Sequence, residues 1–291
     1  MQRLIYKIVY TILFIISKMP MWVLYIMADI LFFFAYYVIG YRKKVVLENL
    51  RLAFPEKTEK QRKRIAREFM KHLCDLVAEN IKTLTISKAE LQKRFKAENI
   101  ELLNSFYKKD KSVLLMTGHY GNWEWGSILN TLTEFQSLAV YKPLRNPHFN
   151  TLIKDIRERF KSQLISNRYI VPALFRKSKE NINTATYILS DQSPKLNAYK
   201  HVDTFMGIRV PVFTGTEEIA KRLDLAVLYL KIEKVKRGYY KATFVTLADE
   251  PKEVPDFDIT RRFFDEIEKQ IIEKPAYYLW SHKRWKHRNR V

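Results

Sequence analysis

The chain has 291 residues, with 52 Lys and Arg against 31 Asp and Glu, so its formal net charge at pH 7 is +21. This length suits one sizeable α/β domain with an appendage, and the charge requires an anionic partner: nucleic acid, a membrane surface or an acidic substrate. The single cysteine, Cys74, excludes an internal disulfide, and the low glycine and proline content argues against long flexible linkers.

Two apolar runs come first in the sequence. Leu4–Ile16 is short for a bilayer span, whereas Met21–Tyr41 has one charged residue and about the twenty residues that a spanning helix needs. Three basic residues follow directly: Arg42, Lys43 and Lys44. The positive-inside rule then puts the rest of the chain on the cytoplasmic face. We expect residues 1–41 to form a membrane anchor, as one span or a short hairpin, and residues 42–291 to form a basic domain held against anionic lipid. A buried core helix is the alternative.

Helices and short apolar strands alternate from residue 100 onwards. Strands are predicted at Val113–Thr117, Ser137–Val140, Tyr187–Ser190, Ala226–Ile232 and Tyr240–Thr246. Helices are predicted at Trp123–Leu132, His148–Lys161, Pro172–Lys179, Thr216–Leu223 and Thr260–Glu273. Upstream, Glu56–Leu84 has the periodicity of one or two amphipathic helices, and Thr214 with Glu217 fits a capping box. The alternation predicts an α/β fold, with a mainly parallel or mixed sheet covered by helices and active groups at the carboxyl ends of strands.

The strongest chemical signal follows the predicted strand Val113–Thr117. There His119 lies at the strand's carboxyl end and Glu124 lies in the first turn of the next helix, where its carboxylate can fold back onto the imidazole. A neutral histidine can take a proton from a hydroxyl while a carboxylate on its other nitrogen fixes the tautomer. Backbone N–H groups around Gly121 and Asn122 are placed to bind a developing oxyanion. The alternative is that His119 and Glu124 are merely structural.

Two further clusters are candidates for the same site. Asp191 directly follows a predicted strand, as His119 does, and Arg157 and Arg159 lie on a predicted helix. An Asp and an Arg near a catalytic His can orient one another or bind phosphate, although a surface ion pair is the simpler alternative. Residues 280–288 intersperse cations with aromatic residues. That composition suits lipid headgroups or RNA, unless the segment is a disordered basic end.

Short motifs are spread over nearly the whole chain: Arg42, 48–50, 53–55, 118–124, 141–147, 191–192, 205–207, 211–215 and 278–286. In this order they resemble the bacterial lipid A late acyltransferases, within the wider lysophospholipid acyltransferase superfamily. The resemblance implies a glycerolipid-acyltransferase-like fold at the cytoplasmic face of the bacterial inner membrane. It also implies transfer of an acyl chain from acyl carrier protein, or acyl-CoA, to a hydroxyl of an anionic membrane lipid, a lipid A precursor.

The same resemblance implies roles for individual residues. The family's His-x4-Asp/Glu motif falls on His119 and Glu124, and its downstream Arg and Asp fall on Arg159 or Arg157 and on Asp191. The donor thioester is already activated, so we expect no metal, no cofactor and no covalent enzyme intermediate. Basic residues near the membrane are expected to hold acceptor phosphates or headgroups: Arg145, Lys283, Arg284 and Lys286.

Several other functions remain open on the sequence alone. Residues 200–203 depart from the usual lipid A enzymes, so the acceptor can instead be a lysophospholipid, glycolipid or aminoacyl lipid. A membrane-tethered nucleic-acid-binding protein would suit the charge, but no recognisable RNA or DNA module is present and we expect no nucleic-acid partner. A metal hydrolase is disfavoured because the other histidines lack ligand spacing near His119. A catalytically dead scaffold is the last alternative.

Overall fold

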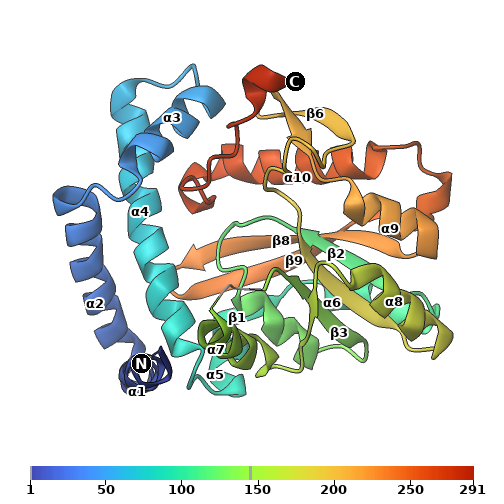
Figure 1. The fold of residues 1–291 in the computed structure, drawn as a ribbon, viewed down its shortest axis with the longest axis horizontal. Coiled ribbons are helices and arrows are strands. Elements are labelled where there is room, and N and C mark those ends of the chain that lie inside the picture. Colours follow the sequence, from blue (N-terminus) through green and yellow to red (C-terminus); the bar gives the residue numbers. More distant parts are fainter. Residues whose placement is uncertain (1, 144–145) are drawn as a thin grey trace.

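A seven-stranded sheet forms the centre of the computed structural model, which describes residues 2–143 and 146–291 (Figure 1). Its strand order is β1-β9-β8-β2-β5-β3-β4. The strands are β1 (Phe95–Ala97), β2 (Val113–Thr117), β3 (Gln136–Tyr141), β4 (Gln163–Ser166), β5 (Thr184–Leu189), β8 (Ala226–Lys236) and β9 (Tyr239–Ala248). Strands β2, β3, β4, β5 and β8 run parallel, while β9 is antiparallel to β8 and pairs in parallel with β1. The predicted α/β fold with a mainly parallel or mixed sheet is confirmed.

Helices cover both faces of this sheet, and the alternation of side chains along β2 divides the core accordingly. Leu114 and Met116 belong to the layer that includes α8 (Ile170–Lys179), α9 (Gly215–Leu223) and α10 (Asp258–Glu273). Val113 and Leu115 belong to the opposite layer. That layer's helices are α5 (Lys88–Arg94), α6 (Ile100–Lys108) and the 3₁₀ helix η2 (Trp125–Thr131). Helix α7 (Pro147–Glu158) lies between β3 and β4 in the chain.

Four helices come before α5 and the first strand, β1: α1 (Gln2–Lys18), α2 (Met21–Phe33), α3 (Lys43–Ala53) and α4 (Glu59–Lys82). The two apolar runs form separate helices, with Pro20 directly before α2, and a π-helical turn, η1 (Phe34–Val38), extends α2. The predicted one or two helices within Glu56–Leu84 are a single helix, α4, which begins with a capping box between Thr58 and Gln61.

One helix among the described residues is long and apolar enough to cross a membrane: Met21–Val38, with 18 residues and a mean hydropathy of 1.8. One side of it packs against α4, which stands between α2 and the β8–β9 end of the sheet (Figure 1). The opposite side exposes large apolar side chains: Trp22, Ile26, Ile30, Phe33, Phe34 and Val38. The anchor at residues 1–41 therefore stays a prediction, and the structure adds that one side of α2 belongs to the protein core.

Two local predictions are wrong, and in each case side-chain hydrogen bonds explain why. The segment predicted as helix Trp123–Leu132 forms the 3₁₀ helix η2, because the Asn122 side chain accepts a bond from the Trp125 N–H at 3.0 Å and begins a tighter turn. The predicted capping box at Thr214 is absent. Its partner Glu217 instead accepts bonds from the backbone and side chain of Thr260, at the start of α10.

The structure also contains strands that the sequence patterns missed. Besides β1 and β4 there is a separate two-stranded antiparallel hairpin, β6 (His201–Phe205) with β7 (Ile208–Val212). Residues 200–203, which depart from the family's pattern, therefore lie at the beginning of this hairpin, outside the central sheet.

Candidate functional site

His119 and Asp191 meet at one edge of the sheet because their strands are parallel neighbours. Strands β2 and β5 pair with Thr117 opposite Leu189, and each of the two residues lies two positions beyond its strand's last residue. The Asp191 carboxylate, 1% exposed, accepts a bond from the imidazole Nδ1 at 2.6 Å and one from the His119 backbone N–H at 3.1 Å. The structure thus brings Asp191 and His119 into direct contact, and their joint function stays a prediction.

These contacts determine the state of the imidazole. Burial raises the pKa of Asp191, but the charge of His119 and hydrogen bonds from its side chain and backbone outweigh burial and hold this pKa below its usual value. The ionised carboxylate can only accept, so Nδ1 carries the proton and Nε2 presents its lone pair. The side-chain amide of Gln192 donates to Nε2 at 3.1 Å. A general base requires such a lone pair, and the Gln192 amide occupies it in this structure.

Two glycines allow the chain to turn beside His119. A Cβ at Gly118 would lie 1.9 Å from Ile267 Cδ1, and Gly121 has a φ of +60°, a left-handed conformation that L side chains rarely adopt. The Gly121 N–H donates to the Tyr277 carbonyl oxygen at 3.1 Å. The predicted oxyanion-binding role of this N–H is therefore wrong, because the fold already uses the donor.

Asn122 is likewise committed to the fold. It is 1% exposed, and its Oδ1 forms the bond to the Trp125 N–H described above. Its Nδ2 donates to the Glu79 carboxylate at 2.6 Å. The side chain of Asn122 thus shapes the turn after His119 and has no polar group left for substrate.

Glu124 does not hold the imidazole. Its carboxylate forms a two-pronged ion pair with Arg157, with Nε–Oε2 at 2.8 Å and Nη2–Oε1 at 2.5 Å, and accepts a bond from Trp123 Nε1 at 3.2 Å. The expectation that Glu124 folds back onto His119 is wrong, because Asp191 occupies Nδ1 and the guanidinium fork matches the Glu124 carboxylate. Arg157 is at the site as predicted, but it contacts Glu124.

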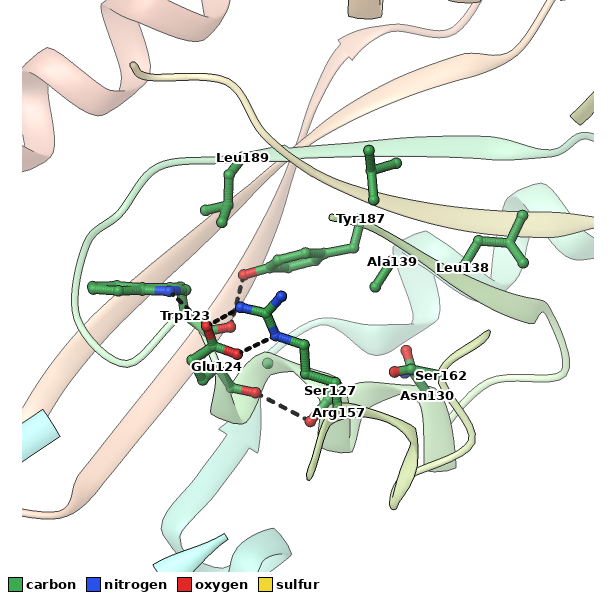
Figure 2. A pocket seen from close by; sticks show the side chains of 12 residues that line it. Trp123, Glu124, Ser127, Asn130, Leu138, Ala139, Arg157, Ser162, Tyr187 and Leu189 are labelled. Carbon is green, nitrogen blue, oxygen red and sulfur yellow. Dashed lines mark hydrogen bonds and ion pairs between the residues drawn. The ribbon is translucent and has the colours of Figure 1, made fainter. Parts of the chain in front are cut away.

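Glu124 and Arg157 form part of the wall of a small pocket with a volume of about 50 Å³ (Figure 2). This volume is below that of most small-molecule sites, so the pocket as it stands can receive only a small part of a substrate. The pocket lies between β3, β5, η2 and α7, and its wall is mainly apolar: Trp123, Leu138, Ala139, Val140, Tyr187 and Leu189. The Trp123 ring also packs edge-on against the imidazole of His119, with the ring centroids 5.1 Å apart. Trp123 therefore connects the pocket to the base.

Other residues predicted for the site lie elsewhere. Arg159 donates to the backbone carbonyls of Thr83 and Ile86, so it braces the connection between α4 and α5. Arg284 is 1% exposed and its guanidinium packs over the Phe205 ring, so it is buried away from any headgroup. Neither side chain lies where the sequence placed it: Arg159 binds backbone carbonyls between α4 and α5, and Arg284 is buried in the core. Among the other cations, Lys283 and Lys286 are exposed, and Arg145 lies outside the described residues.

The segment after α10 is an ordered brace, which excludes a disordered basic end. Trp280 and Trp285 are at most 1% exposed, so their rings are not available for stacking on RNA bases. The Leu279 N–H donates to the His119 carbonyl oxygen at 3.0 Å. Asn49, from the Glu-Asn-Leu motif on α3, donates to the carbonyl oxygens of Trp280 and His282 at 2.8 and 2.7 Å. The motifs around Asn49, His119 and Trp280 are thus far apart in the sequence but are linked by hydrogen bonds in the structure.

Sequence reasoning missed Gln192 and Tyr187 as site residues. Gln192 had a usable signal, because it follows the residue that reaches His119 at the end of β5. Tyr187 looked like an ordinary strand residue, yet it lines the pocket and its hydroxyl donates to the Trp123 carbonyl oxygen at 3.0 Å. Within residues 2–143 and 146–291, no group of three or more His, Cys, Asp or Glu side chains is arranged to hold a metal ion.

Comparisons with known proteins agree on one family. A family model described as bacterial lipid A biosynthesis acyltransferase matches residues 1–287. The lipid A biosynthesis palmitoleoyltransferase of Escherichia coli (strain K12) is 23% identical over 252 residues, which cover 85% of this chain and 79% of that protein. The lipid A biosynthesis acyltransferase of Haemophilus influenzae is 24% identical over 238 residues, covering 80% and 72%. The match therefore includes the site as well as most of the fold.

Proposed function

Because the chain belongs to the bacterial lipid A biosynthesis acyltransferase family and is an acyltransferase, we propose that it transfers a fatty acyl chain from a thioester to a hydroxyl of a lipid A precursor, with His119 as general base. The observation that carries this proposal is the His119 imidazole, held at Nδ1 by Asp191 and contacted at Nε2 by the Gln192 amide, beside a mainly apolar pocket. The thioester donor is acyl carrier protein or acyl-CoA, and the acceptor is an anionic lipid.

The proposed reaction begins when the acceptor hydroxyl replaces the Gln192 amide at Nε2. The hydroxyl proton passes to Nε2 as the oxygen attacks the thioester carbonyl carbon, and the ionised Asp191 stabilises the imidazolium. The tetrahedral intermediate then collapses, the C–S bond breaks, and the leaving thiolate takes the proton back from Nε2. One ester forms and one thioester is consumed. We assign the displaced Gln192 amide as a donor to the oxyanion, a role supported by its position 3.1 Å from the base.

The pocket is the proposed site for part of the acyl chain. This assignment is supported by its apolar walls and by Trp123, which lines the pocket and contacts His119. Two of its polar side chains are already paired with each other, because Asn130 Nδ2 donates to Ser162 Oγ at 2.5 Å. An alkyl chain can therefore lie beside them without leaving a buried donor unsatisfied.

Enlarging Gly126 is expected to shorten the preferred acyl chain. A Cβ there would lie 3.3 Å from the Tyr187 hydroxyl, so a larger side chain must occupy pocket volume. We expect Gly126→Val to shift the ratio of kcat/KM between a long and a short donor by about tenfold for each excluded methylene. Competition between donors of different chain lengths measures this ratio, with Gly215→Val, whose Cβ meets nothing within 4 Å, as control. An unchanged ratio would place the acyl chain elsewhere.

Replacing Glu124 with glutamine is expected to slow transfer about 10²-fold, because Arg157 loses its two-pronged partner and the pocket wall shifts. Steady-state kinetics with wild type, Glu124→Gln and His119→Ala measure the effect. A loss equal to that of His119→Ala would indicate that Glu124 contacts the imidazole in the working complex, contrary to the pairing described here. Wild-type rates in Glu124→Gln would show that the Glu124 carboxylate has no role in transfer.

The proposed location is the cytoplasmic face of the inner membrane. It is supported by the net charge of +21 and by apolar side chains that are about half exposed along α1: Ile5, Ile8, Ile12 and Ile15. These residues recur every three or four positions, so they form one stripe, as in helices that lie on or in a bilayer. The exposed side of α2 adds further apolar side chains.

A single assay tests the proposed function against its alternatives. Detergent-solubilised protein is incubated with radiolabelled acyl carrier protein or acyl-CoA and with a tetra-acylated lipid A precursor. Label on the precursor is the expected result. Label that moves only to an added lysophospholipid, glycolipid or aminoacyl lipid would change the acceptor, and label released to water would indicate a hydrolase. Salt-sensitive retention of RNA without transfer would indicate a binding protein.

A further inference from the structure

A buried carboxylate lies behind the loop that carries His119, and the proposed chemistry does not use it. Glu79 on α4 has an exposed fraction of 0%. It accepts hydrogen bonds from Asn122 Nδ2 at 2.6 Å, from the Tyr240 hydroxyl at 2.8 Å and from the Tyr25 hydroxyl at 3.0 Å. Burial raises the pKa of Glu79 to about 7, although the Lys234 charge and the hydrogen bonds from Tyr240 and Asn122 lower it. A carboxyl group buried at this cost raises the question of what its three donors serve.

One purpose is to orient the Asn122 amide. Its oxygen accepts from the Trp125 N–H and its nitrogen donates to Glu79, so the two ends are not interchangeable. Rotating the amide by half a turn would put its N–H₂ group against another donor and its oxygen against a carboxylate. Glu79 therefore selects the orientation in which Asn122 closes the turn, three residues after His119.

A second contact from α4 holds the preceding residue. Lys234 Nζ donates to His72 Nδ1 at 3.1 Å and to Asp75 Oδ2 at 3.2 Å. The other ring nitrogen of His72 therefore carries its proton and donates to the Gly121 carbonyl oxygen at 3.3 Å. Burial and the neighbouring Lys234 charge hold the pKa of His72 well below its usual value, which keeps the ring neutral.

The two contacts come from one face of α4, because positions 72 and 79 are seven residues apart and are therefore two helical turns apart. They fix consecutive residues, Gly121 and Asn122, in the turn whose other end is His119. Helix α4 thus supports the loop through contacts separate from those of Asp191. The pair Glu79–Asn122 is the more specific contact, since it involves two side chains at 2.6 Å.

We propose that Glu79 is a positioning residue for acyl transfer: through Asn122 it sets the turn at residues 118–122 and, with it, the position of the His119 imidazole. Glu79 touches neither donor nor acceptor. Its removal should leave substrate binding intact while the base points away from the attacking hydroxyl. The inference rests on the proposed function for its kinetic readout only.

The first test compares Glu79→Ala with an equally buried carboxylate elsewhere. Glu217 is 3% exposed and accepts bonds from the Phe257 and Thr260 backbone N–H groups and from the Thr260 hydroxyl, remote in the chain from residues 118–122. We expect Glu79→Ala to lower kcat about 30-fold with KM nearly unchanged. Glu217→Ala should lower thermal stability but leave kcat within about threefold. The proposal would be overturned if Glu79→Ala and Glu217→Ala lost equal stability and also equal kcat. It would also be overturned if Glu79→Ala kept the wild-type kcat.

A rescue experiment tests the pair itself. Asn122→Asp sets two carboxylates against each other and should lower kcat about 10²-fold. Adding Glu79→Gln provides an amide that can donate to the new carboxylate, so the double variant should recover most of that loss. This holds also if the single variant fails to fold, because the double variant is then expected to fold and turn over. A double variant no better than Asn122→Asp alone would overturn a direct role for Glu79.

Hydrogen exchange gives a readout that needs no activity. Backbone amides in residues 118–125 should exchange faster in Glu79→Ala than in wild type. In Glu217→Ala their exchange rates should equal those of wild type. Unaltered exchange in Glu79→Ala would overturn the proposal. If the wild-type protein transfers no acyl group to any lipid tested, the proposed function fails, while the exchange comparison still decides whether Glu79 positions the loop.

Discussion

Replacing His119 with alanine is expected to reduce acyl transfer about 10³-fold, because the variant has no group to take the acceptor proton. The protein should keep its fold, since two backbone bonds at this position do not depend on the imidazole: the Leu279 N–H donates to the carbonyl oxygen of residue 119, and the N–H of residue 119 donates to Asp191. Initial rates at saturating donor and acceptor measure the loss. Circular dichroism and thermal unfolding of the same preparations test the fold.

A suitable control for this experiment is His201→Ala. His201 stacks on Phe257 in the hairpin region, with the ring centroids 4.0 Å apart, and has no contact with the described site residues. We expect this variant to retain wild-type turnover. If His119→Ala retained it too, a different residue would have to be the base and the proposed mechanism would be wrong.

Replacing Asp191 with asparagine is expected to reduce the rate about 10² to 10³-fold at neutral pH. The carboxylate now fixes the proton on Nδ1; an amide can donate to that nitrogen instead, which moves the proton to Nε2 and removes the base's lone pair. We measure kcat between pH 5 and 9 for wild type, Asp191→Asn and His119→Ala. A tautomer effect lowers kcat of Asp191→Asn at every pH, whereas a changed imidazole pKa only moves its pH–rate profile along the pH axis. An Asp191→Asn enzyme with wild-type kcat would remove Asp191 from the mechanism.

The thermal stability of Asp191→Asn shows whether the ionised Asp191 carboxylate stabilises or destabilises the folded protein. The pKa of Asp191 is lower in the folded protein than in the unfolded chain, so its ionised form stabilises the fold above the unfolded pKa. That contribution is lost as the pH falls through the folded pKa. The difference in thermal stability between wild type and Asp191→Asn should therefore be largest near neutral pH and shrink in acid. A difference that grows in acid would contradict the lowered pKa.

Much of this arrangement can be read from the sequence. Strand β2 is a buried, mainly apolar run and β5 ends in the apolar residues 187–189. Parallel pairing brings the residues that follow the two strands together, so the meeting of His119 with Asp191 was predictable. Short strands carry less information. Strand β4 has four residues at the sheet edge and the β6–β7 hairpin is outside the sheet, so neither has a strong apolar pattern.

The errors come from contacts between distant parts of the chain. Glu124 lies close to His119 in sequence, so local spacing favoured it, but Arg157 binds its carboxylate and Asp191 takes the imidazole from 72 positions away. The basic residues near the carboxyl end gave a similar error. Composition alone does not distinguish an exposed Lys283 from an Arg284 that lies against Phe205 in the core. Only tertiary packing decides which cation reaches solvent.

The packing of α2 on α4 has a consequence for which hydroxyl is acylated. Helix α2 is fixed to the domain by the Tyr25–Glu79 bond and by Asp29, whose carboxylate pairs with Arg237 at 2.8 Å. With α2 in the bilayer as proposed, this rigid attachment sets a constant depth for Nε2 of His119 relative to the lipid surface. An acceptor hydroxyl then reacts according to how far it lies from the headgroup plane. With this anchoring, the fixed depth of His119 would select which acceptor hydroxyl is acylated, without separate recognition of each acyl chain of the acceptor.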